Sequence, residues 1–259
     1  MPDGWGDLLD ESYWEEVGER YGQEIFDSAA NDLNGVIEAR IDRYADPSAT
    51  ACDFGCGVGH YLQLLSPRFG RVVGLDHAES LVEQARRRCE KLNNVKVLRA
   101  DLTRAKLPVG RSEFGVCANV LISEHPRLRS AILRSVRRGL RPGGIVVILV
   151  PSLESALFAN QHLVEWNRRR GFSQQEALEA GLPPTRRTAR ELLEGLVRIE
   201  GVATKHYLRE EAVFGFVRAG FEMVAVEKVE YAWSTEFDRP PSWMNEPLPW
   251  DWLITLRRG

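Results

Sequence analysis

The chain has 259 residues, enough for one large α/β domain that carries an insertion. Apolar residues make up 44% and charged residues 27%, which is typical of a globular protein, and the net charge of −3 provides no basic field for a nucleic-acid backbone. No apolar run reaches the roughly 20 residues that a membrane helix needs, and no apolar signal stretch opens the sequence. We therefore expect a cytoplasmic protein with no nucleic-acid or membrane partner. The four cysteines form no CxxC pair and no histidine stands at zinc-ligand spacing from them, so we predict reduced thiols and no metal site.

Short β-branched runs alternate with helical stretches through the middle of the chain. Before them, residues 11–44 predict two helices, within an N-terminal helical cap over residues 1–45. The alternation predicts strands over residues 50–54, 71–76, 95–100, 114–121 and 145–150, and helices that begin at residue 61 and extend over residues 78–91 and 126–140. Gly143 and Gly144 are expected to end the last of these helices. The pattern indicates a doubly wound, Rossmann-like α/β sheet with mostly parallel strands.

The pattern changes after residue 151. Residues 152–207 are mostly helical in tendency and contain no strand run of comparable quality, so we interpret them as a helical insertion within a single domain of residues 1–259. A helix over residues 209–219 and a strand over 221–231 resume the alternation. A stretch rich in tryptophan and proline follows, and a short strand over residues 252–257 closes the chain.

A glycine loop follows the first predicted strand and opens a helix. Asp53 stands two residues before Gly55, and Gly57 and Gly59 follow. Glycines at such a turn let the backbone approach a ligand closely. A dinucleotide fingerprint requires its third glycine three residues after the second, whereas Gly59 comes two residues after Gly57. A carboxylate at position 53 would repel a pyrophosphate but suits a cationic amino acid.

Five segments in this order and spacing make the chain similar to the class I S-adenosylmethionine-dependent methyltransferases, in particular to bacterial members that act on small molecules. The segments are DFGCGVGHYL at 53–62, VVGLDHAESLVEQA at 72–85, RADL at 99–102, GVCANVLISEH at 115–125 and GLRPGGIVVILVPS at 139–152. The segment WEEVGERYGQEIF at 14–26 also resembles the lead-in of these members. The resemblance implies S-adenosylmethionine as cofactor, a small-molecule substrate and an antiparallel last strand.

The resemblance also implies roles for individual residues. Asp53, Gly55, Cys56 and Gly57 would surround the methionine half of the cofactor, and Tyr21 would close over its carboxylate. The two oxygens of Asp76 would accept hydrogen bonds from both ribose hydroxyls, since a carboxylate suits a vicinal diol. The other cofactor contacts would be Asp101 and Leu102 at the adenine edge, and Asn119 and Val120 beneath the cofactor. His77 would belong to the shell of residues around the cofactor or to the surface. A cap over residues 102–107 is the alternative role for Asp101, and packing is the alternative for Tyr21.

Candidate catalytic residues are few, because methyl transfer from a sulfonium depends chiefly on alignment in a dry site. His125 follows the fourth strand at the ligand edge, and His206 with Tyr207 precedes the helix that leads to the sixth strand. We predict that one of these histidines assists deprotonation of the acceptor, with Tyr207 or Glu124 orienting it. The Asn/Asp-Pro-Pro-Tyr motif of amide and nucleobase amino methylation is absent, which favours O, N or C methylation of a small molecule.

Both extra segments leave the carboxyl ends of predicted strands, where parallel sheets bind ligands, so we expect them to build the acceptor pocket with the insertion as a lid. The stretch before the last strand combines aromatic faces with carboxylates, which suits an amine-bearing acceptor. Its residues of these kinds are Trp233, Trp243, Trp250, Glu236, Asp238, Glu246 and Asp251. Packing of the loop by buried indoles is the alternative for the tryptophans, and a homodimer interface is the alternative for the insertion. Three other functions stay open: methylation of a peptide or protein, a non-catalytic cofactor-binding role, and an NAD(P)-dependent oxidoreductase.

Overall fold

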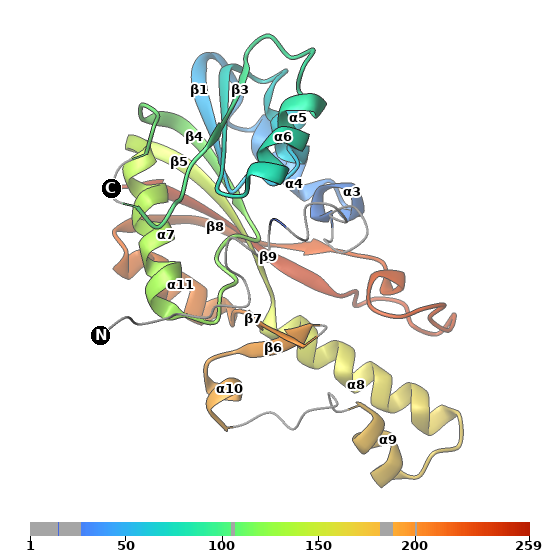
Figure 1. The fold of residues 1–259 in the computed structure, drawn as a ribbon. Helices are drawn as coiled ribbons and strands as arrows, with labels where there is room; N and C mark the ends of the chain where they lie inside the picture. Colours follow the sequence, from blue (N-terminus) through green and yellow to red (C-terminus); the bar gives the residue numbers. More distant parts are fainter. Residues whose placement is uncertain (1–14, 16–26, 105–106, 182–188, 200) are drawn as a thin grey trace.

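A seven-stranded sheet forms the centre of the molecule (Figure 1). The computed structural model describes residue 15 and residues 27–104, 107–181, 189–199 and 201–259. The strand order is β3-β2-β1-β4-β5-β9-β8. The strands are β1 (Asp46–Phe54), β2 (Phe69–Asp76), β3 (Val95–Arg99), β4 (Ser112–Ala118), β5 (Leu140–Pro151), β8 (Phe221–Glu230) and β9 (Trp250–Arg258). The first five pair in parallel, while β9 is antiparallel to both β5 and β8. The predicted Rossmann-like fold with an antiparallel last strand is confirmed.

Helices cover both faces of the sheet because successive strand residues point to opposite sides. On one face, the core includes side chains from α4 (Val36–Asp42), α5 (His60–Leu65) and α6 (Glu79–Arg88). On the other face it includes side chains from α7 (Pro126–Gly139) and α11 (Arg209–Arg218). Val72 and Val73 of β2 illustrate the alternation, since each belongs to a different one of these two clusters.

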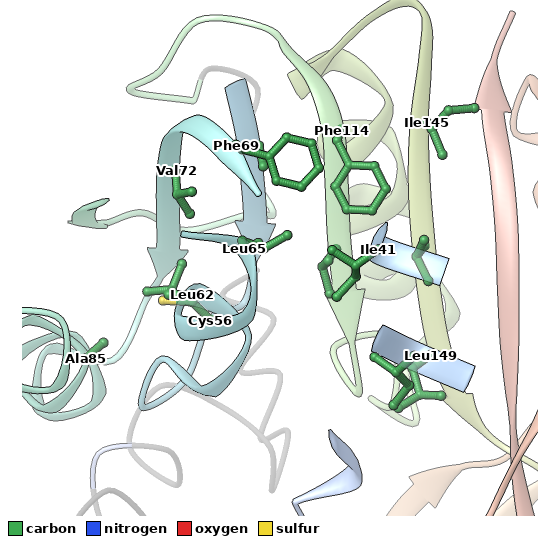
Figure 2. Packing of buried hydrophobic residues seen from close by; sticks show 14 of the residues in the cluster. Ile41, Cys56, Leu62, Leu65, Phe69, Val72, Ala85, Phe114, Ile145 and Leu149 are labelled. Carbon is green, nitrogen blue, oxygen red and sulfur yellow. The ribbon is translucent and has the colours of Figure 1, made fainter. Parts of the chain in front are cut away.

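Aromatic rings fill the first face near the amino ends of the strands (Figure 2). The rings of Phe69 and Phe114 stack with their centroids 5.0 Å apart. Ile41 and Leu65 come from the covering helices and belong to the same buried cluster. The helices are therefore fixed by side-chain packing on the face opposite α7 and α11.

The segment between α7 and β5 differs from the prediction. Gly143 and Gly144 do not end the helix, which stops at Gly139, and β5 begins at the next residue. Gly143 lies inside the strand with φ 75°, and the register between β4 and β5 shifts between Ser112 and Phe114. The glycine pair thus marks an irregularity in a strand, where a positive φ is required.

The insertion contains a small hairpin that the sequence analysis missed. Strands β6 (Leu196–Ile199) and β7 (Val202–Lys205) pair antiparallel, with Gly201 at φ 89° beside the turn. The valines and isoleucine of these runs favour strands, but each run has only four residues and is preceded by helical sequence. The helical part is α8 (Leu153–Arg169), α9 (Gln174–Gly181) and α10 (Ala189–Leu193).

The long helix of the insertion packs against the tryptophan-rich segment. Ala159 of α8 shares a buried cluster with Trp233 and Met244, and Phe158 and Trp166 pack against its edge. Trp233 opens the short 3₁₀ helix η1 (Trp233–Thr235). The two segments therefore form one packed unit next to the carboxyl end of β5.

The described N-terminal part contains α3 (Ser28–Asn31) and α4, and both lie within the predicted helical cap. Asp27 caps α3 through its side chain, which accepts a hydrogen bond from the backbone of Ala30. Among the described residues, no helix is long and apolar enough to span a membrane.

We expect Gly139→Ala to destabilise the fold. A Cβ at this position would lie 2.6 and 2.7 Å from two ring atoms of Phe54, which is fully buried. Overpacking of this kind lowers the free energy of unfolding by about 1–3 kcal/mol, measurable by urea denaturation. Gly110→Ala is the matched control, since nothing lies within 4 Å of its added Cβ. Equal stability of the two variants would contradict this packing.

Candidate active site

The carboxyl ends of β1, β2 and β4 meet at one edge of the sheet, where parallel sheets bind ligands. The glycine loop leads from β1 into α5 at this edge. Gly55 has φ 81°, and a Cβ there would lie 2.4 Å from Cγ2 of Val120, just beyond β4. Any larger residue at position 55 would clash with Val120, so glycine is required here. The glycine loop therefore packs against the segment after β4, as the sequence predicts.

Asp53 is a buried carboxyl group at the end of β1. Its residue is 1% exposed, and neither carboxyl oxygen has a hydrogen-bond partner among the described residues. Burial raises the pKa of Asp53 to about 8, and the nearby charge of Asp76 contributes. Because buried polar groups are nearly always satisfied, this carboxyl group indicates a ligand that brings a cation or hydrogen-bond donors.

Asp76, the last residue of β2, holds the glycine loop. Its Oδ2 accepts a hydrogen bond of 2.8 Å from the backbone of Gly57, and its Oδ1 accepts one of 3.2 Å from Ala78. Nδ1 of His77 lies 3.5 Å from Oδ1. Each carboxylate oxygen has two lone pairs, so the carboxylate retains acceptor capacity for a further ligand.

A hollow of about 500 Å³ lies beyond the end of β3. Asp101 lines it, but the same carboxylate accepts hydrogen bonds from the backbone and hydroxyl of Thr103, at 2.8 and 2.6 Å. Burial opposes ionisation of Asp101, but these bonds and one from Arg104 dominate and lower its pKa. Asp101 therefore caps the local turn and also faces the hollow. The lining residues are His77, Arg99, Ala100, Asp101, Arg104, Leu107 and Pro108.

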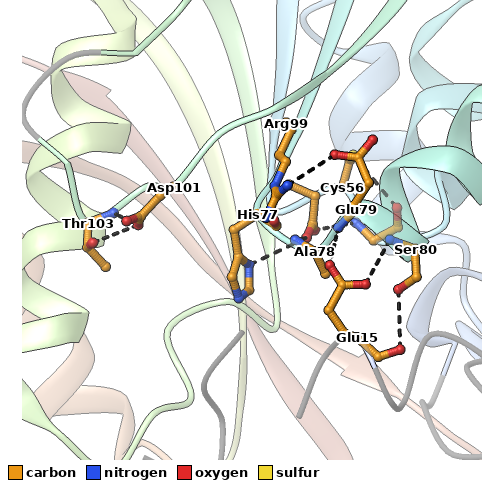
Figure 3. A network of polar contacts seen from close by, with 11 residues as sticks. Glu15, Cys56, His77, Ala78, Glu79, Ser80, Arg99, Asp101 and Thr103 are labelled. Carbon is orange, nitrogen blue, oxygen red and sulfur yellow. Dashed lines mark hydrogen bonds and ion pairs between the residues drawn. The ribbon is translucent and has the colours of Figure 1, made fainter. Parts of the chain in front are cut away.

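The sequence analysis missed Glu15, whose side chain contacts the start of α6 in this region (Figure 3). Its carboxylate accepts hydrogen bonds from the backbone N–H groups of Glu79 and Ser80, at the start of α6. Ala78 at the N-cap has no side chain that can cap this helix. Slight burial opposes ionisation, but the bonds from Ser80 and Glu79 lower the pKa of Glu15. No local sequence signal links position 15 to a helix that starts 64 residues later.

Asn119 lies immediately beyond β4 in an unusual conformation. Its φ of 55° is rare for a residue other than glycine, and its Nδ2 donates to the hydroxyl of Ser28 at 3.1 Å. Its Oδ1 is buried and has no partner within the described part of the chain. A strained residue with an unsatisfied acceptor is typical of a binding site.

Two predicted cofactor residues turn their side chains into the protein. Cys56 is buried, its Sγ would lie 3.0 Å from a Cβ added at Gly74, and burial raises the pKa of its thiol. Leu102 is buried in the core cluster that contains α7. Only their backbone groups are available to a ligand at this edge. Tyr21 lies outside the described residues.

The predicted catalytic residues lie near one another although they are distant in sequence. The hydroxyl of Tyr207 donates to the carbonyl of Leu121 at 2.7 Å, and the backbone of Lys205 donates to Ile122 at 2.8 Å. His206 is buried, with Nδ1 3.1 Å from the carbonyl oxygen of Thr204.

Half-buried His125 precedes α7, only three residues beyond Ile122. Burial raises the pKa of Tyr207, which supports a structural role for its hydroxyl in holding the segment after β4. Catalysis by His125, His206 or Tyr207 stays a prediction. Among the residues that the structure describes, no group of three or more His, Cys, Asp or Glu side chains could hold a metal ion.

The structure separates the acidic residues of the tryptophan-rich segment into two kinds. The side chain of Asp238 is 84% exposed and pairs with Arg239, and Glu246 is also exposed. Asp251 instead lies opposite Pro151 of β5, and burial raises its pKa to about 7. The indole N–H of Trp233 donates to Asn245 at 3.0 Å, so this tryptophan packs the loop.

Comparisons with known proteins agree with this geometry. Residues 51–144 match the model of a methyltransferase domain. Trans-aconitate 2-methyltransferase of Azoarcus sp. is 35% identical over 108 residues, which cover 41% of this chain and 40% of that protein. Carboxy-S-adenosyl-L-methionine synthase of Hydrogenovibrio crunogenus is 27% identical over 154 residues, covering 56% and 60%. The chain thus spans less than two thirds of the length of these curated relatives.

A solved structure shows the same fold. The 1,6-didemethyltoxoflavin-N1-methyltransferase of Burkholderia thailandensis, with bound 1,6-didemethyltoxoflavin and S-adenosylhomocysteine, superposes with a TM-score of 0.63 at 15% identity. The match covers 96% of this chain and 87% of that one. Residues 51–144 therefore match a methyltransferase domain, and the chain has the fold seen in solved S-adenosylmethionine-dependent methyltransferases.

Proposed function

We propose that the protein transfers a methyl group from S-adenosylmethionine to a small-molecule acceptor. The observation that carries the proposal is the enclosed carboxyl group of Asp53, which has no described partner and lies directly before the glycine loop. The ammonium of the cofactor's amino-acid half is a cation that such a group would bind. When bound, S-adenosylmethionine supplies a methyl group already activated by a sulfonium.

The remaining edge residues fit the other parts of the cofactor. Asp76 has spare acceptor capacity for two ribose hydroxyls while it holds the loop. Asp101 lines the hollow beyond β3, which has room for a purine ring. Asn119 and Val120 complete the edge between β4 and the glycine loop. These roles bring together residues from three strand ends.

The acceptor would bind beside the packed unit of α8 and the tryptophan-rich segment. Both parts follow the sheet at its carboxyl edge, and their contact through Ala159, Trp233 and Met244 supports a common wall. Such a wall would exclude water from the transfer site. We infer a lid-like role for the insertion, and a dimer interface is the competing use.

The alternatives differ in their support. The methyltransferase domain and the antiparallel β9 argue against an oxidoreductase. The unpaired Asp53 supports cofactor binding but does not distinguish an enzyme from a non-catalytic binding protein. The relatives named above act on small molecules by their names, which favours a small acceptor over a peptide.

The direct test is a screen of metabolites with purified protein and S-adenosylmethionine, read by mass spectrometry. We expect one acceptor class to gain 14 mass units, about the mass of the CH₂ added by methyl transfer, while S-adenosylhomocysteine accumulates. A protein that binds S-adenosylhomocysteine tightly yet methylates nothing, peptides included, would favour the non-catalytic alternative.

Asp53 should release a proton when S-adenosylhomocysteine, the product formed from the cofactor, binds. With a pKa of about 8, Asp53 holds a proton at pH 7 in the unliganded protein, and an ammonium beside it would lower that pKa. Calorimetry with S-adenosylhomocysteine in two buffers of different ionisation enthalpy should show release approaching about one proton at pH 7. Asp53→Asn should bind without this release. Equal proton release by both proteins would contradict the role of Asp53.

Asp53 should also make the unliganded protein less stable as the pH rises. Its folded pKa lies above the unfolded value of about 4, so between about pH 4 and pH 8 the unfolded chain binds fewer protons than the folded one. The free energy of unfolding should therefore fall across this window in the wild type and fall less in Asp53→Asn. Urea denaturation at pH 5.5 and pH 8 measures the difference. Parallel pH profiles would contradict it.

Asp76→Ala should weaken binding of S-adenosylhomocysteine at least tenfold. The variant loses the acceptor for both ribose hydroxyls and releases the backbone of Gly57. Losing a charged hydrogen-bonding group of this kind costs on the order of 2 kcal/mol or more. Glu83→Ala, at an exposed pair with Arg87, is the control and should bind normally. Unchanged affinity in folded Asp76→Ala protein would refute the ribose assignment.

A further inference from the structure

A chain of hydrogen bonds runs from the end of β4 to the start of β9. Nδ2 of Asn119 donates to the hydroxyl of Ser28 at 3.1 Å, and the side chain of Ser28 is hydrogen-bonded to Tyr231. The hydroxyl of Tyr231 then donates to Oδ2 of Asp251 at 3.0 Å. Because Asn119 donates at one end and the carboxylate accepts at the other, the donors point toward Asp251 throughout. The carboxylate of Asp251 is the terminal acceptor of the chain.

Asp251 is partly buried and partly exposed to solvent. It lies opposite Pro151 of β5 and Val229 of β8, at the carboxyl edge of the sheet. Its side chain also accepts a hydrogen bond from the backbone of Ser152, and its residue keeps part of its surface exposed. Burial is the main cause that raises its pKa to about 7. A carboxyl group with this pKa is half ionised near neutral pH, as proton acceptors in enzymes commonly are.

Glu236, at the end of η1, adds a second negative charge that acts on Asp251. Its charge contributes to the raised pKa of Asp251, and burial raises the pKa of Glu236 itself. Glu236 as a whole is an exposed residue, so solvent and ligands can reach it. Neither acid forms an ion pair with a basic side chain in the part of the chain that the structure describes. A partly buried carboxylate on which a second negative charge acts favours a cationic ligand.

We propose that Asp251 accepts the proton of a protonated amine acceptor and that Glu236 selects this cation. The inference rests on the proposed methyl transfer and names its acceptor class. The ammonium N–H bond breaks, and its proton passes to the carboxylate of Asp251. The lone pair left on nitrogen forms the new N–CH₃ bond while the S–CH₃ bond breaks, which yields a methylammonium product and neutral S-adenosylhomocysteine. Charge and atoms balance without a further reactant.

The residues around Asp251 determine whether a substitution among them raises or lowers its pKa. Tyr231 donates to the carboxylate and stabilises its ionised form, so Tyr231→Phe raises the pKa of Asp251. Glu236 repels the carboxylate, so Glu236→Gln lowers that pKa. Tyr61 is a further titratable group beside Tyr231. Ser28 and the backbone of Ser152 are further polar neighbours among the described residues.

The first test needs no acceptor. Carbon NMR of protein labelled at aspartate carboxyl groups should show one resonance that titrates near pH 7 and is absent from Asp251→Asn. It should move to higher pH in Tyr231→Phe and to lower pH in Glu236→Gln. Exposed Asp238→Asn is the control and should leave it unchanged. An Asp251 resonance that titrates below about pH 5, near the value for an ordinary aspartate, would overturn the proposal.

The second test uses matched pairs of amines and alcohols of the same carbon skeleton, with S-adenosylmethionine. We expect methylation of amines only, and a fall in kcat/KM of about 100-fold or more in Asp251→Asn at pH 8, as for loss of a general base. In the wild type, kcat/KM should fall at low pH as Asp251 becomes protonated, and in Tyr231→Phe this fall should move to higher pH. Preference for alcohols, or loss of this fall in His206→Ala but not in Asp251→Asn, would overturn the proposal. Normal binding of S-adenosylhomocysteine by Asp251→Asn separates this outcome from failure of the cofactor site.

Discussion

The carboxyl group of Asp53 is enclosed at the end of β1, close enough to Asp76 for the second charge to raise its pKa. An enclosed acid without a hydrogen-bond partner is unfavourable until a donor or a cation reaches it. The same edge depends on Asp76, which holds the backbone of Gly57, and on Gly55, which contacts Val120. A ligand cation bound to Asp53 would therefore stabilise the ends of β1, β2 and β4 together, because a ligand that binds only the folded state raises its stability.

The polar chain from Asn119 to Asp251 extends this edge across the sheet. It passes through Ser28 of α3 and Tyr231 beyond β8, so it adds a polar connection between the ends of β4, β8 and β9 and the N-terminal part. Aligned hydrogen bonds of this kind strengthen one another in a medium of low polarity. Two buried or partly buried acids thus lie along this edge, Asp53 on β1 and Asp251 on β9. In the two proposals above, Asp53 binds the ammonium of the cofactor and Asp251 takes a proton from the acceptor.

Local patterns predicted the sheet well because its strands are short apolar runs bounded by glycine or by charged residues. They failed at Gly143, where a glycine pair serves a strand irregularity, and at the hairpin of β6 and β7, whose runs have four residues each. At the site, spacing identified Asp53, Gly55 and Asp76, because these residues follow strands directly. The sequence could not separate Asp251 from Asp238, since only the pairing of β9 with β5 encloses one and leaves the other in solvent. Glu15 and Ser28 were missed because their partners are distant in sequence.

The contact of Glu15 with the start of α6 also constrains how this protein can diverge. Helix α6 has no capping side chain of its own, and its first backbone N–H groups depend on an acid contributed from outside the segment that matches the methyltransferase domain. Recombination that exchanges N-terminal segments between relatives would therefore preserve this helix start only when the incoming segment carries an acceptor at the matching position. Position 15 and positions 78–80 are expected to change together during evolution, although they belong to different parts of the chain.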